Sequence, residues 1–183
     1  MIYGEKIRFR LMEQTEFDTN LVLRWRNNKG MHHHYFNSDP LTKYGHQKFL
    51  EKSIAAGDKN FIVEMENKDG TWIPVGVVAV LHINYISRNA EWGRFIVSPD
   101  YSGLGIGRKI ENLIMSYVFD TLNMNKLWCE VINNNQRVID QHERSGFIVE
   151  GIKRKHLFKE GKYHDVVFMG MLKNEWEAKN AKQ

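Results

Sequence analysis

The sequence has little cysteine, no long apolar run and no large excess of either charge, and each shortage narrows the class of protein. Its 183 residues include one cysteine, Cys129, which excludes a disulfide within the chain and fits a reducing cytoplasm. No apolar run approaches the roughly 20 residues that cross a bilayer. Residues 1–6 lack the apolar region of a secretion signal. Lysine and arginine number 26 against 22 aspartates and glutamates, and they are scattered. We therefore expect a cytoplasmic protein that has neither a membrane nor a nucleic acid as partner.

The remaining composition and the order of sequence patterns predict one α/β (α+β) domain. The chain is 42% apolar and 26% charged, as globular proteins are, and its length suits a single domain over residues 1–183. Strands are expected at 6–11, 61–65, 72–86 (one strand or two), 90–97, 126–132, 147–152 and 163–172. Helices are expected at 16–25, 42–56, 106–117 and 133–145, and from 174 onward. This order is typical of a mixed sheet with helices packed on its faces.

A glycine loop between a strand and a helix is the organising stretch of the sequence. The apolar run Phe95–Val97 stops at a proline, and glycines then occupy positions 103, 105 and 107. The apolar residues that follow recur at one-face helical spacing: Ile106, Ile110, Leu113, Ile114 and Tyr117. Alternating glycines leave backbone N–H groups uncovered, and free amides at a helix N-terminus favour an anion. The loop therefore predicts a phosphate site, although it also fits a flexible turn that enters an ordinary helix.

Two motifs carry a resemblance to a known family along nearly the whole chain. The first is Ser102-Gly103-Leu104-Gly105-Ile106-Gly107, and the second is Asn135-x-x-Val138-x-x-x-His142-Glu143-x-x-Gly146-Phe147. They resemble the Gln/Arg-x-x-Gly-x-Gly/Ala and Asn-x-x-Ala-x-x-x-Tyr-Glu-x-x-Gly-Phe motifs of the GNAT superfamily of acetyl-CoA-dependent N-acetyltransferases. Ser102 stands where the family prefers glutamine or arginine, which removes one side-chain contact to the pyrophosphate of the coenzyme.

The resemblance implies a single GNAT-type domain with a twisted mixed sheet that is splayed in its middle, with helices on both faces and acetyl-CoA as cofactor. The pantetheine arm would enter the gap and pair with a strand, and the amides of the glycine loop would hold the pyrophosphate. The residues implied in coenzyme binding are Phe95, Ile96, Val97, Ser102, Gly103, Leu104, Gly105, Ile106, Gly107, Arg108 and Asn135.

Other segments resemble two subgroups of the superfamily that differ in their acceptor amine. Residues 83–91 and 161–166 are similar to the spermidine and ribosomal-protein N-acetyltransferases and also to the N-acetyltransferase that acts on a UDP-4-amino-4,6-dideoxy-sugar in pseudaminic acid biosynthesis. The run 23–27 and the histidines at 46 and 142 favour the second subgroup. Its acceptor would be the 4-amino group of the sugar, and the residues implied in holding it are Arg24, Trp25, Arg26, Asn27, His46, Tyr85 and Tyr163.

In this interpretation an arginine fork holds the diphosphate and Trp25 stacks on uracil. The same residues also fit a solvated helix end with a tryptophan in the core. Tyr163 would line the pocket or only support a hairpin. A spermidine-type polyamine or a ribosomal-protein N-terminus is the alternative acceptor, although a polyamine site needs an acidic lining.

Direct attack of an amine on a thioester needs a donor of a proton to the thiolate and a base for the amine. We expect His142 to be the acid, because histidine donates protons near neutral pH and stands where the family has its tyrosine. Glu130 and Glu91 are the candidate bases, since each lies on a strand that borders the expected gap. All three also fit ordinary structural roles. Cys129 is not expected to be a nucleophile, because a thioester is already activated.

Three further expectations concern class, assembly and metals. The alternative to an enzyme is a non-catalytic regulatory module that binds CoA. The resemblance allows a homodimer through the C-terminal strands. No metal is expected, because the consecutive His32, His33 and His34 cannot all face one ion from a regular strand or helix.

Overall fold

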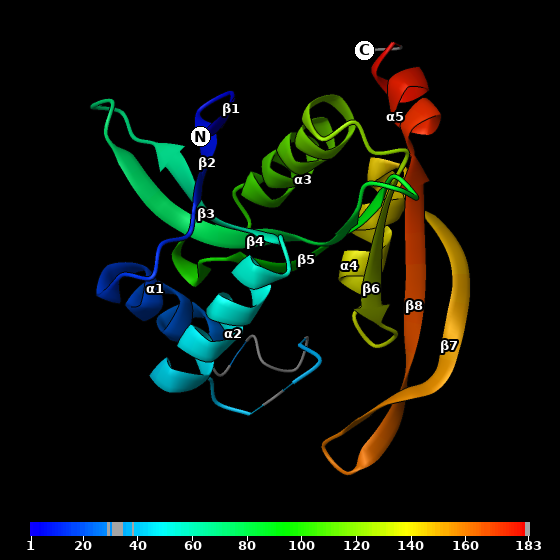
Figure 1. Cartoon of the computed structure of the whole chain (residues 1–183), viewed down its shortest axis with the longest axis horizontal. Coiled ribbons are helices and arrows are strands. Elements are labelled where there is room, and N and C mark those ends of the chain that lie inside the picture. The colour runs from blue at the N-terminus through cyan, green and yellow to red at the C-terminus, as the bar shows by residue number, and fades with distance from the viewer. Residues whose placement is uncertain (29, 31–34, 38, 182–183) are drawn as a thin grey trace.

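Eight strands form one sheet whose two halves diverge below its middle (Figure 1). The structure is a computed structural model that describes residues 1–28, 30, 35–37 and 39–181. The strands lie in the order β1-β2-β3-β4-β5-β6-β8-β7 across the sheet. Their bounds are β1 (Ile2–Gly4), β2 (Ile7–Leu11), β3 (Lys59–Glu66), β4 (Trp72–Asn84), β5 (Asn89–Val97), β6 (Lys126–Ile132), β7 (Ile148–Lys159) and β8 (Lys162–Leu172).

The helices begin where the sequence supplies suitable caps. The hydroxyl of Thr15 accepts a hydrogen bond from the Asp18 amide at the start of the first helix. Thr42 does the same for the Gly45 amide at the start of the second. The helices are α1 (Glu16–Arg26), α2 (Lys43–Ala55), α3 (Ile106–Ser116), α4 (Gln136–Ser145) and α5 (Lys173–Asn180), and a π-helical turn over Tyr117–Thr121 continues α3.

Alternating residues of the N-terminal strands pack against helices on opposite faces of the sheet. Phe61 and Val63 of β3 belong to the large core cluster that includes Ile110 of α3. Ile62, between them, belongs to a smaller cluster with Trp25 of α1. This alternation follows from the two-residue period of a strand. Figure 1 accordingly shows α3 on one side of β3–β5 and α1 with α2 on the other, which confirms the predicted mixed sheet with helices on both faces.

The observed elements differ from the predicted ones at a few ends. β1 was not expected, because three residues give too short a pattern to detect. Residues 72–84 form one strand, and β7 continues to Lys159 instead of ending near residue 152. A tight turn then reverses the chain, with Glu160 and Gly161 at φ 52° and 77°, the sign that a type I′ hairpin requires. Among the described residues, no helix is long and apolar enough to cross a membrane.

Candidate active site

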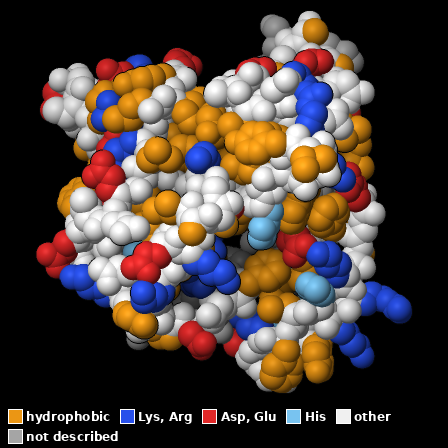
Figure 2. Space-filling view, in the orientation of Figure 1, with side chains coloured by type: hydrophobic (Ala, Val, Ile, Leu, Met, Phe, Trp, Pro, Cys, Tyr) orange, Lys and Arg blue, Asp and Glu red, His pale blue; other side chains and the backbone are white. Residues whose placement is uncertain are grey.

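A cleft opens where β5 and β6 stop pairing. The two strands pair in parallel only between Asn89–Glu91 and Lys126–Trp128. Beyond that point β5 stays with β4, and β6 stays with β8, so the sheet divides. A bulge marks the division, because Arg94 and one further residue of β5 oppose a single residue of β4 and Arg94 has a left-handed φ of 53°. The cleft has a volume of about 1110 Å³, and Figure 2 shows the surface hollowed near the centre of the view.

Aromatic rings pack together near the point where the two strands separate. The ring of Trp92 on β5 meets the ring of His142 on α4 edge-on, with centroids 5.0 Å apart. Trp92 also lies 5.4 Å from the ring of Phe95 and 6.1 Å from that of Phe147. These contacts pack β5 against α4 next to the point where β5 and β6 stop pairing. The backbone of β5 past this point therefore borders the cleft and not a neighbouring strand on the β6 side.

The glycine loop presents bare backbone amides to the cleft. Gly103 and Gly105 have φ values of 83° and 74°, in the left-handed region that residues with a Cβ rarely adopt. Helix α3 begins directly after Gly105, and no side chain caps its first turn. The first N–H groups of α3 therefore remain available to a ligand, and the helix dipole favours an anion there. The loop fits the pyrophosphate of a coenzyme A.

Four basic side chains of the neighbouring helices also line the cleft. Arg108 comes from α3, Arg137 and Arg144 come from α4, and Lys179 comes from α5. Lys179 donates a hydrogen bond to the Arg144 carbonyl at 3.0 Å, which places α5 beside α4. These cations suit the phosphates of the same ligand. Of these four, only Arg108 was predicted from the sequence, because Arg137 and Arg144 occupy unspecified positions of the second motif and Lys179 lies outside both motifs.

The coenzyme residues named from the sequence lie together at the cleft, with one exception. The residues that line it are Phe95, Ile96, Val97, Ser102, Gly103, Gly105, Ile106, Gly107, Arg108 and Asn135. The side chain of Leu104 instead points to solvent and is 67% exposed, so only its backbone belongs to the loop. Asn135 is mostly buried at the N-cap of α4, where its side chain makes no capping hydrogen bond.

His142 lies inside the cleft wall and is held by a buried carboxylate. Its Nδ1 atom is 2.7 Å from Oε1 of Glu111 on α3. Ser145 donates its hydroxyl to Oε2 of the same carboxylate at 2.7 Å, and Gln141 donates Nε2 at 3.2 Å. Glu111 is 0% exposed. Glu111 was not predicted as a site residue, although a glutamate among the apolar residues of α3, next to Ile110, was a visible signal.

Both candidate bases line the cleft, and each has a basic partner. Oε2 of Glu91 lies 2.6 Å from Nδ1 of His82, and Glu130 pairs with Lys153. Burial raises the pKa of the Glu91 carboxyl, and the hydrogen bond and charge of His82 offset part of that rise. Cys129 on β6 is buried, and burial raises the pKa of its thiol, so it stays protonated and is a poor nucleophile.

The residues predicted to grip a nucleotide sugar are dispersed. Trp25 is 1% exposed in the core under α1, so it cannot stack on a base. Asn27 exchanges two hydrogen bonds with the backbone of Leu41, at 2.9 and 2.7 Å, and thereby supports a loop. The guanidinium of Arg24 lies over the Trp25 ring, outside the cleft. None of these three side chains lines the cleft, because Arg24 and Trp25 face away from it on α1 and Asn27 caps the end of that helix.

The two predicted tyrosines also lie elsewhere. Tyr85 is 63% exposed near the turn between β4 and β5. Tyr163 is 64% exposed in the β7–β8 hairpin, where its ring packs against Phe158 at 5.0 Å. Neither lines the cleft. Strand and turn patterns predict the hairpins, but they do not tell how far each hairpin projects from the sheet.

Arg26 and His46 do line the cleft, together with Tyr35, Phe49 and Arg94, which were not predicted for this role. Arg26 lies over the ring of Tyr35 at 3.9 Å, and Arg94 lies over the ring of Phe49 at 3.4 Å. Burial raises the pKa of Tyr35 to about 12 and lowers that of His46. The Tyr35 hydroxyl and Nε2 of His46 are buried without a hydrogen-bond partner in the described chain. This region is therefore a polar subsite beside the bulge of β5.

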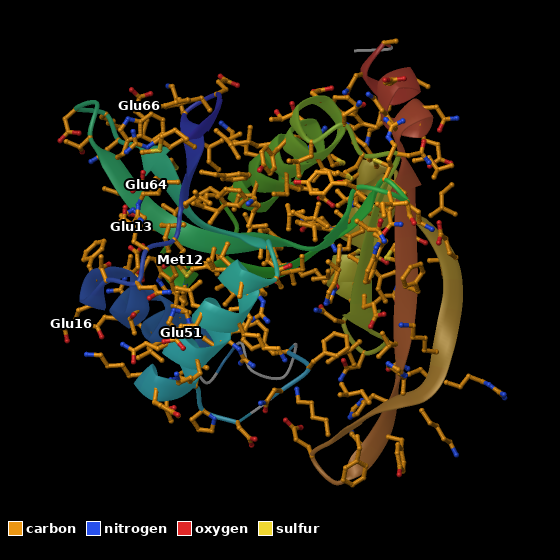
Figure 3. All side chains as sticks on the ribbon, in the orientation of Figure 1. Met12, Glu13, Glu16, Glu51, Glu64 and Glu66 are labelled. Atoms are coloured by element: carbon orange, nitrogen blue, oxygen red, sulfur yellow. The ribbon has the colours of Figure 1, made fainter. Side chains whose placement is uncertain are left out.

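Most acidic side chains of the N-terminal half lie away from the cleft. Figure 3 shows Glu13, Glu16, Glu51, Glu64 and Glu66 over α1, α2, β2 and β3. Glu64, for example, binds Arg8 and Arg10 at 2.7 and 2.8 Å. Of the described residues that line the cleft, only Glu91 and Glu130 are acidic. Where the structure describes the chain, no three metal-binding side chains gather, and His32, His33 and His34 fall outside the described residues.

Comparison with known proteins agrees with this geometry. Residues 6–148 match the family described as the acetyltransferase (GNAT) domain. Spermidine N(1)-acetyltransferase of Vibrio cholerae is 28% identical over 161 residues, which cover 87% of this chain and 90% of that protein. Acetyltransferase PseH of Campylobacter jejuni is 24% identical over 136 residues, covering 72% and 78% respectively.

A solved structure extends the likeness to three dimensions. The crystal structure of spermidine N-acetyltransferase from Vibrio cholerae in complex with CoA and spermine superimposes with a TM-score of 0.81 at 26% identity. The alignment covers 94% of this chain and 98% of that one. PseH is the enzyme of the pseudaminic acid pathway, the subgroup that the motifs favoured. The spermidine enzyme matches more of the chain than PseH does, and at higher identity, so the favoured subgroup is the more distant of the two.

Proposed function

Because the chain belongs to the GNAT acetyltransferase family, it is an acetyl-CoA-dependent N-acetyltransferase, and we propose that its acceptor is a polyamine of the spermidine class. The observation that carries the proposal is the likeness to a spermidine enzyme over most of both chains, in sequence and in fold. Membership of this family also supports an enzyme over a non-catalytic CoA-binding module. The two carboxylates in the cleft support a cationic acceptor, because carboxylates attract ammonium groups.

In the proposed reaction, acetyl-CoA supplies an acetyl group already activated as a thioester. The amides of β5 beyond Trp92 border the gap, where they are placed to donate hydrogen bonds to a carbonyl oxygen as an oxyanion hole does. Glu91 accepts a proton from the attacking amine, directly or through water, because it lines the cleft and is partly desolvated. His142 gives a proton to the departing sulfur. Holding both reactants in one cleft contributes a large part of the acceleration.

A nucleotide-linked amino sugar is the second candidate acceptor, and a specific observation favours it. Arg26 and Arg94 line the same cleft as Glu91 and Glu130, so the polar subsite is not purely acidic. Arginine suits a diphosphate and repels a polycation. The match to PseH is the comparison that speaks for this acceptor. Trp25 does not contribute to it, because the ring is in the core.

A thiol-release assay over a panel of acceptors tests the proposal. Spermidine, a UDP-4-amino-4,6-dideoxy-sugar and a ribosomal N-terminal peptide would each be titrated at saturating acetyl-CoA. We expect kcat/KM for spermidine to exceed the others by at least about tenfold, which corresponds to roughly 1.4 kcal/mol in transition-state binding. Turnover of the sugar without turnover of spermidine would replace the proposal with the second candidate.

A further inference from the structure

We propose that Glu111 is a positioning residue that fixes the tautomer and orientation of His142, so that this histidine exchanges protons with the cleft through Nε2 alone. The inference rests on the proposed proton-donor role of His142. Its basis is the contact between α3 and α4, where Oε1 of Glu111 lies 2.7 Å from Nδ1 of His142. Both side chains are buried, at 0% and 4% exposure.

The hydrogen-bond pattern around Glu111 identifies which nitrogen carries the hydrogen. An ionised carboxylate only accepts hydrogen bonds. Ser145 and Gln141 already donate to Oε2, so the third contact, at Oε1, is completed when Nδ1 donates as well. Three donors compensate for burying the charge of Glu111. In the neutral ring Nε2 is then an acceptor, and in the imidazolium Nε2 is the donor that faces away from Glu111.

Neighbouring aromatic rings fix the orientation of the imidazole plane. Trp92 meets it edge-on at 5.0 Å and 61°, and Phe147 lies 5.5 Å from it on another side. With Nδ1 held by Glu111 and the ring plane held by these contacts, His142 has one free nitrogen, and the residue lines the cleft. A buried carboxylate–imidazole pair contributes little net stability compared with apolar packing. Helix packing alone therefore does not explain a glutamate at this position.

The proton balance follows from this arrangement. The amine nitrogen forms a bond to the carbonyl carbon, the carbon–sulfur bond breaks, and the sulfur takes the proton from Nε2 of the imidazolium. The amine proton leaves to Glu91 and then to water, and water returns one proton to Nε2. In this scheme Glu111 exchanges no proton with the reactants, so its effect on the reaction passes entirely through His142.

Glu111→Gln tests the proposal against a purely structural role. Its amide keeps the size of the side chain but removes the charge. We expect kcat to fall by roughly 10- to 100-fold, while the Kd of acetyl-CoA changes by less than about twofold. In a His142→Gln background the same substitution should have no further effect, because the two residues act as a unit. An unchanged kcat, or an equal loss in both backgrounds, would overturn the proposal.

Glu64→Gln is the matched control, since Glu64 is another mostly buried carboxylate with two side-chain donors and lies away from the cleft (Figure 3). Its kcat should stay within about twofold of the native value. If Glu111→Gln does not fold, Glu111→Asp retains the charge at a shorter reach, and its partial loss of kcat should likewise vanish in the His142→Gln background.

Nitrogen-15 NMR of the histidine rings gives a readout that needs no turnover. Assigned by its loss in the His142→Gln variant, the neutral ring of His142 should show hydrogen on Nδ1, and Glu111→Gln should shift the population toward the other tautomer. A native ring with hydrogen on Nε2 would overturn the positioning role. Because the spectrum is independent of the acceptor, this outcome is distinguishable from a failure of the proposed acetyl transfer itself.

Discussion

The two halves of the cleft are built in different ways. One half, here called the coenzyme half, holds the glycine loop and the residues predicted to bind acetyl-CoA. Its elements β5, the glycine loop and α3 follow one another in residues 89–116, and α4 with its cap adds a second short stretch. The polar subsite combines Arg26 from the end of α1, the loop residue Tyr35, His46 and Phe49 of α2, and Arg94 in the bulge of β5. The coenzyme half is thus formed by segments that are neighbours in sequence, whereas the polar subsite is formed by segments that are distant in sequence and meet only in the folded chain. Substitutions in the first should affect all acceptors by one factor, whereas those in the second should affect each acceptor differently.

The largest expected effect is that of His142→Gln. Loss of the proton donor should lower kcat by about 100-fold or more for every acceptor, with little change in acetyl-CoA affinity. Steady-state kinetics and calorimetry measure the two quantities. His164→Gln is the matched control, because His164 is also buried but does not line the cleft. A kcat that survives in the first variant would remove His142 from the acid role.

Gly105→Ala should have the next largest effect. A Cβ at φ 74° strains the loop that carries the free amides, and losing one phosphate contact corresponds to about 1.4 kcal/mol, so the Kd of acetyl-CoA should rise by roughly tenfold. Calorimetric titration measures it. Gly70→Ala carries the same kind of strain at φ 82° in the β3–β4 hairpin and should leave the Kd unchanged. Equal effects of the two variants would show that general destabilisation, not the loop, is responsible.

Arg94→Gln should separate the acceptors. Removing one positive charge from the polar subsite should lower KM for spermidine by about two- to fivefold and raise it for a UDP-linked sugar, since a partly exposed charge contributes roughly 1 kcal/mol or less. Initial rates over both acceptors measure this. Arg88→Gln provides the comparison, because Arg88 bonds to Asn123 and lies outside the cleft. If the KM values for spermidine and for the UDP-linked sugar both rose or both fell, the polar subsite would not be the part of the cleft that distinguishes acceptors.

The smallest effect concerns the pH dependence. A base works only when ionised, and burial raises the pKa of Glu91 while His82 lowers it. Without His82 that pKa rises further, so in His82→Ala the fall in kcat/KM on the acidic side should begin at a higher pH than in the native protein. A pH–rate profile measures the shift. An unmoved acidic limb would indicate that Glu130, not Glu91, is the base.

The sequence was sufficient for what neighbouring residues decide. The mixed sheet could be predicted because its strands and helices each show a local pattern, and the glycine loop because its spacing lies within one short segment. The coenzyme was implied by the resemblance of two short motifs to the GNAT superfamily. The placement of His142 at the cleft was predicted by position within a motif. The catalytic roles of His142, Glu91 and Glu130 stay predictions, as do the single domain, the homodimer and the cytoplasmic location.

The acceptor residues were harder to predict, because their side chains are directed by tertiary packing. Trp25 and Asn27 belong to the same short run as Arg26, yet only Arg26 lines the cleft, since successive helical residues point in different directions. The contribution of Arg94 depends on a bulge that no local pattern indicates. Glu111 shows the opposite case, because its unusual residue type was visible but its partner His142 lies 31 positions away.

Helix α3 joins two tasks in a single rigid rod. The uncapped amides of its first turn are available to a coenzyme, and Glu111 lies six positions beyond Gly105, about 9 Å further along the axis. Because α3 is rigid, a diphosphate that fixes the position of its first turn also fixes the position of Glu111, which holds the imidazole of His142. One residue added between positions 107 and 110 would leave loop and helix individually sound, yet swing Glu111 about 100° around the axis and out of reach of α4.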